Sequence, residues 1–447
     1  MNIDLINPRH NYADPQEQYG HIYMPTALLT VAARLLQAGV DVKLYDANIK
    51  KPKVTASVVG IGLLGAPYIP VAIGMQKQYG DKTYLIGGAA AEGLSQGQFE
   101  KLFGTNAFNG NIDELVAEKL GISVSKMPAP EKTSLIPAYE TISDAAMKEY
   151  LSREFSLYVS SGCRFTCTFC SILGKGKGEF YRNTDIIKKD VAYLTERAEK
   201  LGIKELTMYM SNLDVFQSPQ PLKEFAKAII EIKEDRPTID IKLRGLSTVE
   251  MYLHARKDKE LIRLMKEAGF HTVGFGIDGA TAEVHRRTKK PIGNEQDCID
   301  AIIKSYEDGF TPEVLMVFGH EGVDTKESLQ SAYEFAKEMQ DKYGAIPRPH
   351  IAKAFIPGND GWKSEKYRAQ VERLIEEPQL FQSLDFTALP TKFTHPDDTQ
   401  RELATEWYLK MCTLKKNTTQ WIEPLQPGMD EEQKKRAEAI NRGRFDR

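Results

Sequence analysis

Three closely spaced cysteines constrain this chain more than any other feature of its sequence. Cys163, Cys167 and Cys170 follow the spacing C-x3-C-x2-C in the run SSGCRFTCTFC, directly after a predicted strand. Three thiolates at this spacing can reach one iron-sulfur cube, and thiolates are the ligands that such cubes use. One iron of the cube keeps an open position, which separates a reactive metal centre from a closed structural one. The spacing therefore predicts a [4Fe-4S] cluster with one open iron.

A zinc site and a disulfide are the alternatives. Structural zinc needs a fourth ligand at short spacing, but the next histidine is His254 and the next cysteine is Cys298. A disulfide needs an oxidising compartment, which five cysteines in 447 residues and no signal segment do not suggest. Zinc and a chance spacing stay as alternatives to the favoured cluster.

The cysteine motif resembles that of the radical S-adenosylmethionine (radical SAM) superfamily. Phe169 also fits that family, which places an aromatic residue just before the last cysteine. The resemblance implies that the cysteines hold a [4Fe-4S] cluster whose open iron binds the amino and carboxylate groups of S-adenosylmethionine. It implies that one electron from the cluster then releases a 5'-deoxyadenosyl radical. An external electron donor such as flavodoxin or ferredoxin is implied as a partner.

Length and composition predict a multidomain enzyme. A single core stops growing at roughly 250 to 300 residues, so 447 residues predict more than one domain. The formal net charge of −3 provides no global field that favours nucleic acid or an anionic membrane. No apolar run approaches the roughly 20 residues of a membrane helix, and the N-terminal pattern is that of a strand. We therefore expect a cytoplasmic protein that does not bind a membrane.

The first part of the chain, residues 1–122, predicts a doubly wound α/β domain. Short apolar runs alternate with helical patterns there, which is typical of a parallel sheet covered by helices. The expected strands are 3–6, 42–45, 54–63 and 83–86, and the expected helices are 26–38 and 69–79. Sites in such sheets lie at the carboxyl ends of the strands. The candidate binding edge consists of residues 7–23, 46–51, 63–68 and 87–93.

A second series of strands and helices follows a proline-containing linker, residues 123–154. Six strands with crossover helices over residues 155–360 predict a partial (β/α)6 barrel, the barrel of the radical SAM family. The expected strands are 155–161, 205–210, 239–246, 272–277, 313–318 and 350–356. The expected helices are near 185–201, 221–234, 257–268, 295–308 and 326–343. The remaining residues, 361–447, predict a helical C-terminal region with helices at 400–411 and 430–442.

Barrel enzymes place reactive groups at the carboxyl ends of strands, and the family resemblance suggests roles for several of these residues. Ser211 and Asn212 occupy the segment that binds the amino group of S-adenosylmethionine in relatives; a turn followed by an N-cap at Asp214 is the structural alternative. Asp278 stands where relatives place a ribose-binding carboxylate. Arg244 is expected to pair with Asp278 or with the carboxylate of S-adenosylmethionine, and a purely structural ion pair is the alternative.

Three further segments complete the predicted barrel rim. Phe355 resembles the segment that flanks adenine in the family, and His320 replaces an apolar or proline residue in the turn below it. The glycine-rich run at residues 174–178 lacks the spacing of a phosphate-binding loop and is expected to form a flexible, basic rim.

The N-terminal domain resembles the cobalamin-binding module that precedes the barrel in one branch of radical SAM enzymes. The segments at residues 24–29, 42–46 and 86–88 carry the resemblance, whereas the D-x-H-x-x-G motif for a lower cobalt ligand is absent. Cobalamin is therefore expected without a histidine on cobalt. The alternative is a vestigial module that shapes the pocket without a cofactor. Methylthiotransferases also have a domain before the barrel, but theirs contributes three further cysteines to a second cluster. They are disfavoured here, because no cysteine precedes Cys163.

The favoured function is methylation of an unactivated C–H bond in a small-molecule or peptide substrate, with cobalamin as methyl carrier. A cobalamin-free rearrangement, epimerisation or cross-linking reaction is the alternative among enzymes. An iron-sulfur or metal-binding regulatory protein is the alternative outside them.

Overall fold

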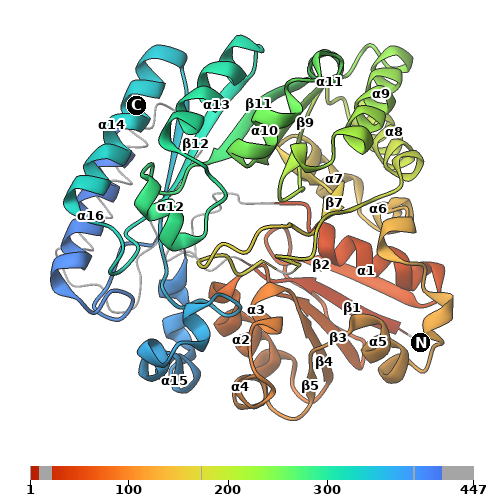
Figure 1. Cartoon of the computed structure of the whole chain (residues 1–447). Helices are drawn as coiled ribbons and strands as arrows, with labels where there is room; N and C mark the ends of the chain where they lie inside the picture. The colour runs from red at the N-terminus through yellow and green to blue at the C-terminus, as the bar shows by residue number, and fades with distance from the viewer. Residues whose placement is uncertain (1, 10–22, 173, 386–387, 415–447) are drawn as a thin grey trace.

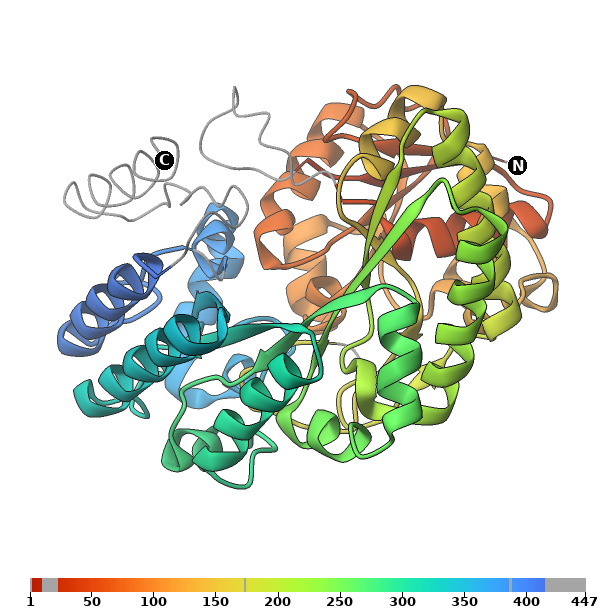
Figure 2. The same ribbon diagram turned by 90° about the horizontal axis from the view of Figure 1, so that it is seen from above.

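The structure is a computed structural model that describes residues 2–9, 23–172, 174–385 and 388–414. Two parallel sheets, each covered by helices, form an N-terminal domain and a partial barrel, and this confirms the predicted α/β class. Figure 1 shows the N-terminal domain in red and orange below the barrel, which runs from yellow to cyan. Figure 2 shows the barrel from above, with the blue C-terminal helix beside its cyan end.

The N-terminal sheet has five parallel strands in the order β2-β1-β3-β4-β5. The strands are β1 (Asn2–Asn7), β2 (Asp41–Asp46), β3 (Val58–Gly62), β4 (Thr83–Gly87) and β5 (Ala107–Phe108). After β1 the chain adds β2 on one side of the sheet. After β3 it adds β4 and β5 on the other side. In such a doubly wound sheet the ligand crevice lies at the carboxyl ends of the two strands where the order reverses. Those strands are β1 and β3.

Helices cover both faces of this sheet. Ile3 and Leu5 face the core under α1 (Thr26–Gln37) and α5 (Ile112–Leu120), while Val59 and Ile61 face α2 (Ile69–Tyr79) and α4 (Gln96–Phe103). The predicted α1 and α2 are confirmed. The sequence pattern missed α4, α5 and the two-residue β5. Alternation of buried residues along β1 and β3 gives each face of the sheet its own core.

The barrel sheet has six parallel strands in the order β13-β12-β11-β10-β9-β6. The strands are β6 (Phe155–Leu157), β9 (Glu205–Met210), β10 (Asp240–Ser247), β11 (Phe270–Gly276), β12 (Thr311–Phe318) and β13 (Ile346–Ile351). The helices are α8 (Thr184–Lys200), α9 (Pro219–Asp235), α10 (Val249–Ala255), α11 (Lys259–Glu267), α12 (Ala282–Thr288), α13 (Glu295–Glu307) and α14 (Lys326–Tyr343). They lie outside the curved sheet (Figure 1).

The last barrel strand begins four residues before its predicted start at residue 350. Pro347 and Pro349 lie inside β13, and proline lacks the N–H group that a central strand would donate. β13 pairs only with β12, so it is an edge strand and one side of its backbone needs no partner. The C-terminal helix α16 (Asp398–Cys412) packs against this strand and covers it. This confirms the predicted helix at 400–411, whereas the one predicted at 430–442 lies outside the described residues.

The predicted strand at residues 155–161 is divided into two. Its first part is β6, and its second part, β7 (Ser160–Ser161), turns away to pair antiparallel with β8 (Phe180–Tyr181). The resulting hairpin encloses the three cysteines between its two arms. Gly162 permits this, because its φ of 87° suits glycine and a Cβ there would lie 2.1 Å from the Gly178 carbonyl oxygen.

The linker is more regular than the sequence suggested. It contains α6 (Ile136–Glu140) and α7 (Asp144–Leu151), and α6 packs against α1 of the N-terminal domain. Leu135, Tyr139 and Tyr150 are buried in a core that continues from the N-terminal domain into the barrel. The linker therefore joins the two sheets through a shared apolar core.

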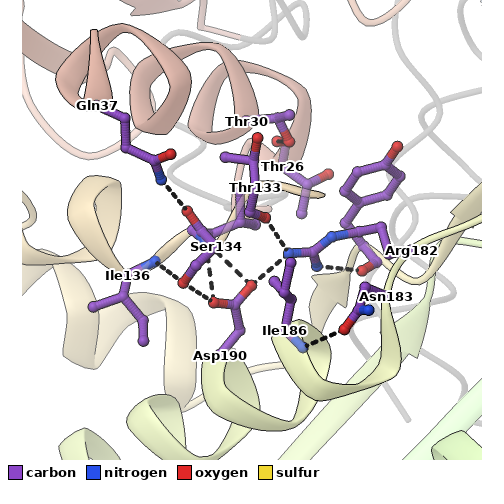
Figure 3. A network of polar contacts seen from close by, with 12 residues as sticks. Thr26, Thr30, Gln37, Thr133, Ser134, Ile136, Arg182, Asn183, Ile186 and Asp190 are labelled. Atoms are coloured by element: carbon purple, nitrogen blue, oxygen red, sulfur yellow. Dashed lines mark hydrogen bonds and ion pairs between the residues drawn. The ribbon is translucent and has the colours of Figure 1, made fainter. Parts of the chain in front are cut away.

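A buried arginine fastens the two arms of the cysteine hairpin to each other (Figure 3). Arg182 follows β8, its amide N–H donates to the Val159 carbonyl at 2.9 Å, and its Nη1 donates to the Tyr158 carbonyl at 2.7 Å. Its Nη2 donates to the Thr133 carbonyl and to Asp190 Oδ2, at 2.7 and 2.6 Å. Both side chains of the Arg182–Asp190 pair are fully buried. The guanidinium thus connects the start and end of the hairpin to the linker.

Asp190 extends the same network to the linker from helix α8 (Figure 3). Its Oδ1 accepts hydrogen bonds from Ser134 Oγ at 2.6 Å and from the Leu135 amide at 3.0 Å. Multiple donors of this kind satisfy a carboxylate that would otherwise be costly to bury. The network consequently holds the hairpin, α8 and the linker in one arrangement.

No helix in the described ranges is long and apolar enough to cross a membrane.

Replacing Asp190 by Ala should destabilise the protein strongly, because the Arg182 charge would remain buried without its partner. Loss of one member of a buried pair typically costs about 3 to 5 kcal/mol. We expect a lower midpoint of urea unfolding, measured by circular dichroism. Glu196→Ala is the control on the same helix, because its partner Lys200 and Glu196 are both exposed. Equal midpoints for the two variants would contradict the importance assigned to the buried pair.

Candidate functional site

The three predicted cluster ligands lie together on the hairpin loop at the carboxyl end of β6. Cys163, Cys167 and Cys170 are free thiols of intermediate exposure. The Cys163 amide donates to the Gly174 carbonyl at 3.3 Å, and Lys175 Nζ donates to the Cys170 carbonyl at 2.7 Å. The glycine-rich run is therefore folded back against the cysteine segment, which it braces through backbone contacts.

Burial keeps two of these thiols protonated in the metal-free protein. Burial raises the pKa of Cys163, and it raises the pKa of Cys167 to about 11. A bound metal reverses this, because coordination deprotonates a thiol outright. In the described ranges no three His, Cys, Asp or Glu side chains converge as a single metal ion would require. A cube instead offers a different iron to each of three separated thiolates, so the donor set fits a cluster better than one ion.

A second feature beside the cysteines is a buried polar cluster with two unused acceptor atoms. Asn212 is 1% exposed, and its Nδ2 donates to Ser160 Oγ at 2.7 Å and to Glu179 Oε1 at 3.1 Å. Asn212 Oδ1 and Glu179 Oε2 are both buried without a hydrogen-bond partner in the described part of the chain. Unsatisfied buried acceptors are costly. A ligand ammonium, which has three N–H donors, would satisfy both oxygens.

The expected ammonium-binding segment after β9 serves two purposes. Asp214 accepts hydrogen bonds from Ser247 Oγ, Thr248 Oγ1 and the Phe216 amide, and it caps a short 3-10 helix, as the structural alternative required. Burial raises the pKa of Asp214 to about 6, although its hydrogen bonds oppose that rise. Ser211 donates its hydroxyl to the Leu157 carbonyl at 3.0 Å. Asn212 alone keeps a free oxygen. The sequence analysis did not identify Glu179 as a site residue, because only the pairing of β7 with β8 brings it next to Asn212.

Arg244 does not pair with Asp278, so that expectation is wrong. Its Nε and Nη2 donate to the Glu154 carboxylate at 2.7 and 2.9 Å, and its Nη1 donates to Glu313 Oε2 at 2.6 Å. Arg348 Nη2 donates to the other Glu313 oxygen at 2.6 Å. Arg244 lies within β10 rather than at its end, since the strand continues to Ser247. These partners assign Arg244 to an ion-pair network inside the barrel and leave no free fork for a cofactor carboxylate.

Asp278 forms the ion pair that the structural alternative predicted, but with a different partner. It contacts Lys290 Nζ through Oδ2, and its Oδ1 accepts from the Val317 amide at 3.2 Å. The residue is 3% exposed and has a φ of 48°. Its contact with the ribose of S-adenosylmethionine stays a prediction, and any such contact would share oxygens that already have partners.

The aromatic predictions separate into one residue at the cysteine loop and one in the core. The ring of Phe169 lies 5.4 Å from that of His320, centroid to centroid, so the turn after β12 reaches the cysteine loop. Phe355 is fully buried and packs against Tyr367 and Phe393. The Phe355 ring is thus part of the apolar core, and the expectation that its segment flanks adenine stays a prediction.

The carboxyl edge of the N-terminal sheet meets the cysteine loop through one short segment. Gly93 ends the short helix α3 (Ala89–Glu92), which comes after β4, and a Cβ there would lie 2.3 Å from the Pro357 carbonyl carbon. On the other side, a Cβ at Gly358 would lie 3.2 Å from the Ser171 carbonyl oxygen. Pro357 and Gly358 are thus packed between the two domains' candidate sites. Glycine at both positions permits this close backbone approach.

The predicted binding edge also carries exposed apolar groups. Leu64, directly after β3, is 74% exposed, and Tyr23, before α1, is 44% exposed. Leu64 follows β3 at the β1/β3 reversal point, where doubly wound sheets bind ligands. The rest of the predicted 7–23 segment lies largely outside the described residues. Exposed apolar side chains at such a point suit a flat, partly apolar cofactor.

Comparison with known proteins decides the class of the barrel. Residues 157–336 match the radical SAM superfamily. The chain contains a radical SAM domain. This confirms the radical SAM resemblance predicted from the cysteine motif. The matched region begins at β6 and includes all three cysteines.

Two relatives extend the match beyond the radical SAM domain. An uncharacterized methyltransferase of Pyrococcus horikoshii is 25% identical over 195 residues, which are 42% of this chain and 39% of that protein. The ribosomal protein uS12 methylthiotransferase RimO of Francisella philomiragia is 25% identical over 336 residues, 69% of this chain and 70% of RimO. The chain thus spans about two fifths of the first relative.

Solved structures share the two-domain fold. The radical SAM methyltransferase TsrM from Kitasatospora setae, solved with tryptophan and an analogue of S-adenosylmethionine, superposes with a TM-score of 0.60 at 14% identity over 80% of this chain and 74% of TsrM. The cobalamin-dependent radical enzyme OxsB, with aqua-cobalamin bound, gives a TM-score of 0.55 at 12% identity over 75% of this chain and 52% of OxsB. At sequence identities of 14% and 12%, these similarities show a shared fold and nothing about function.

Replacing Cys163, Cys167 and Cys170 together by Ala should abolish cluster assembly, because these thiols are the proposed ligands. Anaerobic reconstitution followed by iron and sulfide analysis should find neither bound. Cys298→Ala and Cys412→Ala are the controls and should keep the iron content and charge-transfer absorption of the unmodified protein. Undiminished iron in the triple variant would refute the ligand assignment.

Replacing Glu179 by Gln should weaken the binding of S-adenosylmethionine, because a charge-assisted hydrogen bond to its ammonium would be lost. Such bonds are worth about 1.5 to 3 kcal/mol, or roughly ten- to a hundredfold in affinity. The dissociation constant can be measured by equilibrium dialysis with the reconstituted protein. Glu149→Gln, an exposed change on α7, is the control. Unchanged affinity with intact iron content would assign Glu179 to the hairpin's structure alone.

Proposed function

We propose that this chain methylates an unactivated carbon of a small-molecule or peptide substrate, using a [4Fe-4S] cluster, S-adenosylmethionine and cobalamin. The observation that carries the proposal is the position of the cysteine loop. It lies at the carboxyl end of a radical SAM barrel and is joined, through Pro357 and Gly358, to the ligand-binding edge of a doubly wound domain. When bound, these groups supply the electron, the radical and the methyl group.

The residues of the chain bind and orient these groups. Cys163, Cys167 and Cys170 would hold the cluster on a loop fixed at both ends. Asn212 Oδ1 and Glu179 Oε2 would accept the ammonium hydrogens of S-adenosylmethionine. This orientation would place its sulfonium next to the loop, where electron transfer is short.

The N-terminal domain supports the choice of cobalamin. Its strand order, β2-β1-β3-β4-β5, is one in which ligands bind at the carboxyl ends of β1 and β3, and Leu64, just after β3, is 74% exposed. TsrM and OxsB, which share this fold, were solved with cobalamin bound. Leu64 has no metal-binding group, which agrees with the absence of a histidine motif in the sequence. We therefore propose a corrin without a protein nitrogen on cobalt.

Methylthiolation is the second candidate, because RimO matches two thirds of the chain. The sequence resemblance implies that methylthiotransferases hold a second cluster with three cysteines before the barrel. This sequence has no cysteine before Cys163, and the remaining two, Cys298 and Cys412, lie far apart in the barrel and its C-terminal cover. The absence of three further cysteines before Cys163 therefore favours methylation over methylthiolation.

Protein refolded with cobalamin should retain about one corrin per chain, with the absorption spectrum of cobalamin that lacks a nitrogen ligand below the metal. With a substrate, turnover should yield both 5'-deoxyadenosine and S-adenosylhomocysteine, since one S-adenosylmethionine supplies the radical and another recharges the cobalt. Chromatography of quenched reactions measures both products.

A charged substitution at the exposed residue 64 tests corrin binding without changing the apolar core of the fold. Leu64→Asp should reduce corrin retention, because it puts a solvated carboxylate where the apolar side chain is exposed. Val124→Asp is the control at another exposed apolar residue, 43% exposed, in the linker. If the unmodified chain retained no corrin and formed deoxyadenosine without S-adenosylhomocysteine, the reaction would belong to the cobalamin-free rearrangements.

A further inference from the structure

A buried lysine lies against the cysteine loop from the opposite side of the barrel mouth. The side chain of Lys290 is 10% exposed and forms an ion pair with Asp278. Its Nζ lies 6.0 Å from the ring centroid of Phe169, the residue between Thr168 and Cys170. This ammonium is not needed to ligate iron, and the proposed chemistry leaves it without a role.

The fold holds Lys290 in this position through backbone contacts. The Thr168 amide donates to the Thr288 carbonyl at 3.0 Å, which joins the cysteine loop to the end of α12. The Lys290 amide donates to the His285 carbonyl at 2.9 Å. Gly276 leaves room for the ammonium, because a Cβ there would lie 2.4 Å from Nζ. The lysine charge is consequently fixed beside the loop that carries the proposed cluster ligands.

We infer that Lys290 is a positioning charge that raises the reduction potential of the cluster. The inference rests on the proposed function, since it requires a cluster on Cys163, Cys167 and Cys170. One electron from a low-potential donor adds one negative charge to the cluster on reduction. A fixed positive charge in a poorly solvated position stabilises that added charge, and charge near a cluster is one determinant of its potential.

The paired carboxylate opposes this effect without cancelling it. Lys290 Nζ lies 6.0 Å from the Phe169 ring centroid, whereas Asp278 Oδ1 accepts a hydrogen bond from the Val317 amide on β12. The two residues should therefore shift the potential in opposite directions when each is neutralised.

Two other lysines near the loop help to define the test. Lys175 donates to the Cys170 carbonyl and is part of the loop's own structure, so its replacement would confound charge with geometry. Lys289 is adjacent to Lys290 but is 62% exposed, and its Nζ lies 3.9 Å from Asp360. Solvent screens an exposed charge, which makes Lys289 the matched control.

The test is a redox titration of the reconstituted full chain with dithionite, without S-adenosylmethionine, followed by electron paramagnetic resonance of the reduced cluster. We expect Lys290→Met to lower the midpoint potential, Asp278→Asn to raise it, and Lys289→Met to leave it near that of the unmodified protein. Lys290→Arg keeps the positive charge, so its midpoint potential should be close to that of the unmodified protein. Iron content is measured for each variant.

A potential that is unchanged or raised in Lys290→Met would overturn the inference. If that variant fails to retain iron, Asp278→Asn decides, because it keeps the lysine charge; no rise in its potential would also overturn the inference. An unmodified chain that assembles no cluster at all would instead refute the proposed function. The two failures are thus distinguishable.

Discussion

The buried ion pair between Arg182 and Asp190 fixes the segment from which the site is built. The three cysteines lie on a hairpin loop that makes few regular contacts of its own, since β7 and β8 have two residues each. Arg182 bonds to both the start of that hairpin and the linker, and Asp190 bonds to the linker from α8. A buried charged pair of this kind is stable only in one geometry, because every partner must be in place. The position of the cysteines depends on that geometry.

The polar side chains of the barrel differ in whether their buried atoms all have hydrogen-bond partners. Arg244 has carboxylate partners in Glu154 and Glu313, so it stabilises the barrel interior. Asn212 and Glu179 keep buried acceptor oxygens without partners in the described ranges. Native proteins leave few such atoms unsatisfied, and those that remain call for a ligand or bound water as explanation. The Asn212–Glu179 pair involves the hairpin that carries the cysteines, whereas Arg244 lies within strand β10.

Much of the fold could be predicted from the sequence, because apolar periodicity reflects burial on one face. Helix α2 and strand β9 have the predicted bounds, residues 69–79 and 205–210. Strand β13 was misplaced because prolines usually break strands, and only its edge position allows them. Partners such as Glu154 for Arg244, or Lys290 for Asp278, come from distant segments, so no local pattern indicates them. The cysteine motif could be recognised because its spacing is a local pattern, and the role of its three thiols as cluster ligands stays a prediction.

The central claim is that the three cysteines on the hairpin loop hold a four-iron cluster whose remaining iron binds S-adenosylmethionine. Mössbauer spectroscopy of the protein reconstituted with iron-57 tests it most directly, with and without S-adenosylmethionine. The account predicts a [4Fe-4S] cluster in which one iron site changes its isomer shift when S-adenosylmethionine is added, while the other three do not. A spectrum of tetrahedral single-iron sites, or a cluster whose four irons are all unaffected, would contradict it.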